Sequence, residues 1–244
     1  YSRFNPKTGE HSKDVCDTWG YDYDAFYTVW LVDKTDAYRE AVRKALGNLH
    51  GKYVGAPWGD KSADGYADSI EGAINLINRE PIASAAEWID SQIRLMWAIQ
   101  KPAGIIEGWH GDGNGARTSI MYALWKTQGA HAEPWRADVR LGAVREGNTI
   151  YLSLASDQPW SGRVLFDKPR HKLNFRLPVD YPRINQFPEW FTTEANSRYV
   201  IRDVPTGRDR PLNGNEMQAG VPTELKPGVE LRWRIQEVEK PASR

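Results

Sequence analysis

The segment ADVRLGAVREGNTIYLSLAS, residues 137–156, marks a change in the pattern of this chain. Apolar and polar residues alternate on both sides of REGN, residues 145–148, as in two strands joined by a turn. Before this hairpin the apolar residues recur at helical spacing, and after it they fall into short alternating runs. The segment therefore predicts a chain that is helical first and β-stranded afterwards.

Five helices are predicted between residues 22 and 128, because apolar side chains recur there every three or four positions. The first helix is expected to begin at Asp22 or Asp24. Ser84 and Glu87 have the spacing of a capping box at the start of the fourth helix. The second to fifth predicted helices cover residues 35–49, 64–80, 84–100 and 115–128, in that order.

Short strands are predicted after the hairpin, in runs separated by Gly and Pro. Their spacing favours an antiparallel β-sandwich. A turn-rich stretch at 213–228 is expected to hold a short strand at best. We therefore predict a helical-hairpin domain over residues 1–135 and a β-sandwich domain over residues 136–244. The predicted runs cover residues 162–169, 172–180, 197–204 and 228–239.

The charge of the chain excludes several classes of protein. Lys plus Arg and Asp plus Glu each number 32 in 244 residues, so no basic excess points to nucleic acid or to a membrane surface. The single cysteine, Cys16, excludes an intramolecular disulfide and a cysteine-rich zinc site. Phosphate-loop, dinucleotide and metalloprotease motifs are absent from the sequence. We therefore expect no cofactor and no metal.

The aromatic content is unusual, with 11 Trp and 11 Tyr against 6 Phe. Trp and Tyr combine a flat apolar face with one polar group, and sugars offer C–H faces together with hydroxyls. Any single Trp is more often a core residue, but the total favours a carbohydrate ligand. We therefore expect a polysaccharide or oligosaccharide as the partner.

Three predicted helices, the first, third and fifth, follow similar segments that mix acidic, glycine and polar residues. These lead segments are residues 17–24, 62–69 and 112–118. Alternate helices of an up-down array point the same way, so the three leads are expected along one rim. The alternative is that they serve only as helix caps.

The third lead and the residues before it, GIIEGWHGDGNGAR at 104–117, are the richest in reactive groups. Its histidine and carboxylates can act as general acid or base, and its arginine can bind an anion in a forked geometry. The alternative is a capped, glycine-rich turn. The side chains concerned are Glu107, Trp109, His110, Asp112, Asn114 and Arg117.

The other two leads add further candidates. Asp64 is interpreted as a cap, while Asp68 lies four residues later on the same helix face, with Glu71 three residues beyond. The candidate catalytic residues are Asp112, His110, Glu107 and Asp68. The candidate substrate-binding residues are Trp109, Asn114, Arg117, Asp17, Trp19, Tyr21 and Tyr66.

The acidic, Gly-Tyr-containing leads and the closing segment LKPGVELRWRI at 225–235 resemble the C-terminal part of bacterial (α/α)-toroid carbohydrate-active enzymes. That group includes six-hairpin glycosidases and toroid polysaccharide lyases with a β-sandwich behind the toroid. The resemblance implies a partial toroid followed by a sandwich, in a secreted or periplasmic enzyme. A toroid needs more helices than this chain holds, so the missing N-terminal part of the same protein is an expected partner. No catalytic signature of the group matches residue by residue.

The leading hypothesis is a glycoside hydrolase that degrades polysaccharides with carboxylates on the toroid rim. Such enzymes need two carboxylates roughly 5–10 Å apart. One alternative is a uronate-specific polysaccharide lyase that uses His110, Asn114 and Arg117 with Tyr21 or Tyr66. Another is a non-catalytic carbohydrate-binding fragment.

Overall fold

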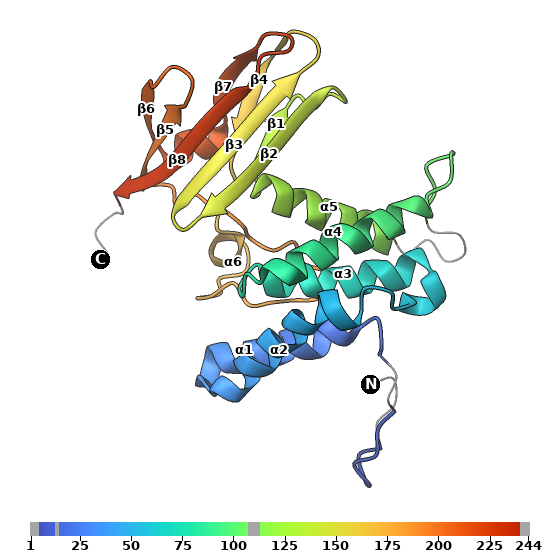
Figure 1. Cartoon of the computed structure of the whole chain (residues 1–244). Coiled ribbons are helices and arrows are strands. Elements are labelled where there is room, and N and C mark those ends of the chain that lie inside the picture. Colours follow the sequence, from blue (N-terminus) through green and yellow to red (C-terminus); the bar gives the residue numbers. More distant parts are fainter. Residues whose placement is uncertain (1–4, 13–14, 107–112, 240–244) are drawn as a thin grey trace. The chain divides into compact units, whose positions relative to one another are not determined.

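The computed structural model describes residues 5–12, 15–106 and 113–239 (Figure 1). The chain divides into two compact units. The helical unit comprises Tyr1–Tyr122 and Tyr181–Pro188, and the β unit comprises Ala123–Asp180 and Glu189–Arg244. A helical region thus precedes two antiparallel sheets, as the change of sequence pattern predicts.

Four long helices and the start of a fifth build the helical unit. The predicted start of the first helix is wrong: it begins at Trp19, because Trp19 N donates to Cys16 O and the Asp17 carboxylate accepts from Thr18 N. The capping box at Ser84 is also wrong, since Ile82 precedes that helix and makes no side-chain cap. The elements are α1 (Trp19–Asp33), α2 (Asp36–Lys52), the short turn η1 (Trp58–Lys61), α3 (Ala63–Ile77), α4 (Ala83–Ala98) and α5 (Asn114–Thr127).

Helix α3 is the buried centre of this unit and contacts α1, α2 and α4. Its N-cap is Ser62, whose hydroxyl accepts from Gly65 N, and not Asp64. Helices α1 and α3 touch backbone to backbone at Gly20 and Gly72, where an added Cβ on Gly72 would lie 2.5 Å from the Gly20 Cα. Only glycine permits this spacing. It brings the polar side chains of the two helices within hydrogen-bonding distance.

Two antiparallel sheets form the β unit, in the orders β1-β4-β7 and β2-β3-β8-β5-β6. The predicted hairpin is confirmed, since β2 and β3 pair from Val139↔Ser156 to Glu146↔Thr149. The strand predicted at 172–180 is wrong, because Pro169 precedes a helical turn there. The strands are β1 (His131–Glu133), β2 (Val139–Glu146), β3 (Thr149–Ser156), β4 (Trp160–Leu165), β5 (Arg198–Asp203), β6 (Asp209–Asn213), β7 (Val221–Leu225) and β8 (Leu231–Glu239), and the short helices are α6 (Arg170–Leu173) and α7 (Gly214–Ala219).

One apolar cluster contains residues from both sheets of the β unit. Alternate side chains of β3 are buried, as expected for a strand with one face against a core. The turn-rich stretch at 213–228 contributes more than predicted, because its Met217 and Val221 belong to this core. Its helix α7 begins with a capping box between Asn213 and Glu216.

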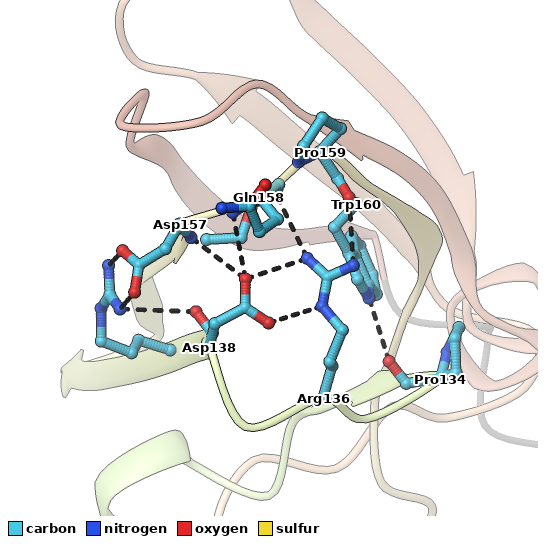
Figure 2. A network of polar contacts seen from close by, with 9 residues as sticks. Pro134, Arg136, Asp138, Asp157, Gln158, Pro159 and Trp160 are labelled. Atoms are coloured by element: carbon cyan, nitrogen blue, oxygen red, sulfur yellow. Dashed lines mark hydrogen bonds and ion pairs between the residues drawn. The ribbon is translucent and has the colours of Figure 1, made fainter.

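A polar network fixes the corner that leads from β1 into β2 (Figure 2). The Arg136 guanidinium donates to both oxygens of Asp138 and to the carbonyls of Gln158 and Pro159. Asp138 also accepts from the backbone N–H groups of Asp157 and Gln158. The hydrogen bonds from Arg136 lower the pKa of Asp138 to about 2. The network therefore ties this corner to the turn between β3 and β4.

Within the described residues, no helix is both long enough and apolar enough to cross a membrane.

Candidate functional site

The leads of α1, α3 and α5 meet in a ring of hydrogen bonds, which we call the polar ring. Its members are Tyr21, Asp68, Glu71 and Arg117. The Tyr21 hydroxyl lies 2.9 Å from Asp68 Oδ1 and 3.1 Å from Glu71 Oε2. Arg117 Nη2 lies 3.0 Å from the same Asp68 oxygen and 2.7 Å from the same Glu71 oxygen. Two acceptor oxygens thus alternate with two donor groups.

When both carboxylates are ionised, one of the four contacts in the ring lacks a proton. The Tyr21 hydroxyl lies close to both Asp68 and Glu71 but can donate its single proton to only one of them at a time. When Asp68 or Glu71 is protonated, its O–H can donate to the Tyr21 oxygen, and all contacts of the ring are then satisfied. Burial raises the pKa of both carboxyl groups, against the lowering effect of Arg117 and Tyr21. The arrangement therefore favours a proton shared among these groups.

Two asparagines extend the ring. Asn185 donates its backbone N–H to Glu71 Oε1 at 2.7 Å, and its side-chain oxygen accepts from Arg117 Nη1 at 2.5 Å. Asn114 accepts from the same Nη1 at 2.7 Å and donates to Asp64 Oδ1 at 2.5 Å. Asp64 and Asp68 are thus linked through Asn114 and Arg117, one helical turn apart on α3.

The members of the ring differ in their access to solvent. Glu71 is fully buried, while the side chains of Asp68 and Arg117 are 15% and 14% exposed. Glu71 is therefore closed off from solvent here, and its hydrogen bonds position Tyr21 and Arg117. Burial, and then the charges of Glu71 and Asp68, raise the pKa of the Tyr21 hydroxyl. Tyr21 is consequently a hydrogen-bond donor at neutral pH and not a base.

A further carboxyl group, Asp24, is buried on α1. It is 3% exposed, and neither of its side-chain oxygens has a hydrogen-bond partner in the described part of the chain. Burial raises its pKa well above the usual range; Arg79 opposes this shift and Glu71 adds to it. Asp24 is therefore neutral over a wider pH range than an exposed aspartate.

A cavity of about 520 Å³ opens on another side of α1. Trp19 and Tyr21 are two positions apart, so their side chains leave the helix in different directions. Trp19 lines the cavity and donates its indole N–H to Ser69 Oγ at 2.8 Å, whereas Tyr21 enters the ring. The aromatic residues of the lining are Trp19, Tyr23, Phe26, Tyr53 and Trp58, and its polar residues include Cys16, Asp22, Asn48 and Lys52.

The remaining predicted residues are placed as follows. Asp17 is part-buried beside η1, where a Cβ added to Gly59 would lie 3.0 Å from its Oδ2. Tyr66 is 6% exposed and belongs to the core of the helical unit. Four candidates lie outside the described residues: Glu107, Trp109, His110 and Asp112.

Three contributors to the site were not among the predicted site residues. In the sequence, Glu71 and Asp64 stand out only as members of the acidic group around Asp68, with Asp64 also interpreted as a cap. Asn185 carries no local signal at all, because it is 114 positions from Glu71 and lies in an irregular segment. The Arg117 guanidinium supplies the positive charge between the two carboxylates of the ring.

In comparisons with known proteins, no family model and no curated protein matches this chain. The choice among functions therefore depends on the geometry of the helical unit.

Proposed function

We propose that the helical unit carries the site of a polysaccharide-degrading glycoside hydrolase, with Asp68 as its general acid. One observation supports this most directly. Asp68 is the carboxyl group of the polar ring that reaches solvent, and burial raises its pKa. A general acid must keep its proton near the working pH, and a raised carboxyl pKa is how glycosidases achieve this.

Asp64 is the proposed second carboxylate. It lies four residues before Asp68 on α3, and Cβ atoms at that spacing are about 5–6 Å apart. Its charge adds to the rise in the pKa of Asp68, so the two groups influence each other. Glycosidase carboxylates stand roughly 5–10 Å apart. Glu107, His110 and Asp112 remain candidates from the sequence alone.

The aromatic cavity supports a carbohydrate ligand. Its size falls within the roughly 300–1,000 Å³ of small-molecule sites. Aromatic faces with Asn48, Asp22 and Lys52 beside them match the mixed apolar and hydroxyl surface of a sugar. This cavity would hold a part of the polysaccharide away from the reacting bond.

The same geometry disfavours the lyase alternative. A lyase of this kind needs a base and a cation that neutralises the uronate carboxylate. The raised pKa of Tyr21 makes it a poor base, and Arg117 already binds two carboxylates. A neutral polysaccharide therefore fits the polar ring better than a uronate polymer does.

The proposal includes the architecture that the sequence resemblance implies. The five helices would form part of an (α/α) toroid, and the two sheets that follow them in the chain would form a β-sandwich. A secreted or periplasmic location would suit an enzyme that acts on polymeric substrates.

A panel of neutral and uronate-containing polysaccharides tests the proposal. New reducing ends without ultraviolet absorbance from an unsaturated uronate indicate hydrolysis. Where hydrolysis is found, Asp68→Asn should lower kcat about a hundredfold or more, because general acid catalysis contributes roughly 10²–10⁴-fold. The matched control is Glu40→Gln, an exposed acid on α2, which should leave kcat unchanged.

Other outcomes would contradict it. Full activity of Asp68→Asn, with a circular-dichroism spectrum like that of the wild type, would exclude Asp68 as the acid. Unsaturated products would favour elimination. Binding of a polysaccharide without any products would favour a binding module, and then the aromatic cavity would be the part to test.

A further inference from the structure

A histidine and two carboxylates meet in the β unit at the ends of a loop. His171 lies in α6, while Asp180 and Glu189 lie immediately before and after the segment Tyr181–Pro188. One ligand atom from each residue lies within 4.8 Å of the others, and all three residues are part-buried. Within the described ranges, no other three His, Cys, Asp or Glu side chains come together in this way.

The histidine and one carboxylate are already held in place. His171 Nδ1 lies 2.7 Å from Glu189 Oε2, and the His171 backbone N–H donates to Glu189 Oε1 at 2.5 Å. The side chains are 12% and 8% exposed. The backbone N–H of His171 thus holds the Glu189 carboxylate against the His171 ring. Two of the three ligand atoms therefore already lie close together without a bound ion.

We propose that His171, Asp180 and Glu189 bind a zinc-type divalent ion. One imidazole nitrogen and two carboxylate oxygens suit Zn²⁺, whereas Ca²⁺ takes oxygen ligands only. A water molecule would complete a tetrahedron. Zinc bonds of about 2.0–2.1 Å place tetrahedral ligand atoms about 3.3 Å apart. The Nδ1 and Oε2 atoms would therefore separate by roughly half an ångström, and the proton between them would leave to solvent.

The ion would cross-link the base of the loop. Asp180 and Glu189 bracket Tyr181–Pro188, the segment that carries Asn185. Binding both flanking residues to one ion closes this loop and lowers its conformational freedom. The site departs from the expectation of a metal-free protein, and it does not depend on the proposed hydrolase activity.

Metal binding to the whole chain tests the site directly. The protein is stripped with a chelator and dialysed against Zn²⁺ or Ca²⁺, and the bound metal is measured by elemental analysis and the Kd by calorimetry. We expect one Zn²⁺ per chain and no Ca²⁺. Asp180→Asn and Glu189→Gln, which keep the side-chain shapes, should weaken zinc binding about tenfold or more. The matched control is His131→Ala, at an exposed histidine of β1, which should bind as the wild type does.

A second readout follows the loop itself. At a Zn²⁺ concentration near the wild-type Kd, Zn²⁺ should slow amide hydrogen exchange across residues 171–189 of the wild type and change the exchange of Glu189→Gln much less. A wild-type protein that binds no Zn²⁺, or variants that bind it with wild-type affinity, would overturn the site. Zinc binding without slower exchange would overturn the cross-link.

Discussion

Replacement of Gly72 by alanine should separate α1 from α3 and destabilise the helical unit. The added Cβ would lie 2.5 Å from the Cα of Gly20 and 3.3 Å from its C and N atoms. Carbon atoms in contact normally stand about 3.5–4.0 Å apart. The obstacle is backbone and not a flexible side chain, so the helices must move apart by about 1 Å.

Two opposing effects set the size of the change. Overpacking of this kind costs about 1–3 kcal/mol, and a contact with rigid backbone belongs at the upper end. Alanine regains up to about 1 kcal/mol because it is a better helix former than glycine. The net expectation is a loss of about 1–2 kcal/mol from the free energy of unfolding. Wider spacing would also lengthen the contacts of Tyr21 with Asp68 and Glu71.

Gly47 in α2 supplies the matched control. It is exposed, and an added Cβ would meet nothing within 4 Å. Gly47→Ala should therefore stabilise the protein by about 0.5–1 kcal/mol. The same chemical change is thus expected to act with opposite signs at the two positions. Urea unfolding followed by the helical circular-dichroism signal measures both, and a Gly72→Ala variant as stable as Gly47→Ala would refute the close approach of α1 and α3.

Three further substitutions test the charged groups by urea unfolding. Arg117→Met should cost about 3–5 kcal/mol, because it leaves the buried Glu71 without a cation, and adding Glu71→Gln should recover most of the loss. Asp24→Asn should match the wild type at about pH 4 and exceed its stability at neutral pH, because the raised pKa of Asp24 makes its ionisation destabilising as the pH rises. Asp138→Asn should be less stable than the wild type at neutral pH. The difference in stability between Asp138→Asn and the wild type should narrow as the pH falls from about 4 towards 2. Arg136 lowers the pKa of Asp138, so the stabilising effect of the Asp138 carboxylate is lost as it takes up a proton in that range. If the free energy of unfolding of Asp24→Asn or Asp138→Asn depends on pH in the same way as that of the wild type, the pKa shift assigned to that residue is contradicted.

The helical spacing of apolar residues predicts the positions of the helices well, but it predicts the residues at which they begin less well. The start of α4 shows why: Ser84 and Glu87 have the right spacing for a cap, but the chain enters this helix at Ile82 in an extended conformation, so Ser84 is already inside it. A capping box does form at Asn213 and Glu216, in a stretch whose glycines and prolines predict only turns. Spacing identifies possible caps, while the path of the preceding residues decides which of them form.

The site was partly predictable for a related reason. Similar leads into alternate helices predicted one rim, and Tyr21, Asp68 and Arg117 do meet there. The direction of each side chain was harder to predict, because neighbours on one lead diverge around the helix and Trp19 lines the cavity while Tyr21 joins the ring. Asn185 could not be found from the sequence, since only the folded path of the chain brings it to Glu71.

The burial of Glu71 is the feature of α3 that stability alone does not explain. The rest of this helix is largely small or apolar and packed, whereas the Glu71 carboxylate faces the Tyr21 hydroxyl, the Arg117 guanidinium and the Asn185 backbone N–H. Burying an ion pair is often no better for stability than a well-packed apolar substitute. Glu71 nevertheless orients Tyr21 and Arg117 against Asp68, and it also adds to the raised pKa of Tyr21. A carboxylate placed there makes physical sense if the helix must hold Asp68 with a proton available, which is the role that the proposed hydrolase assigns to it.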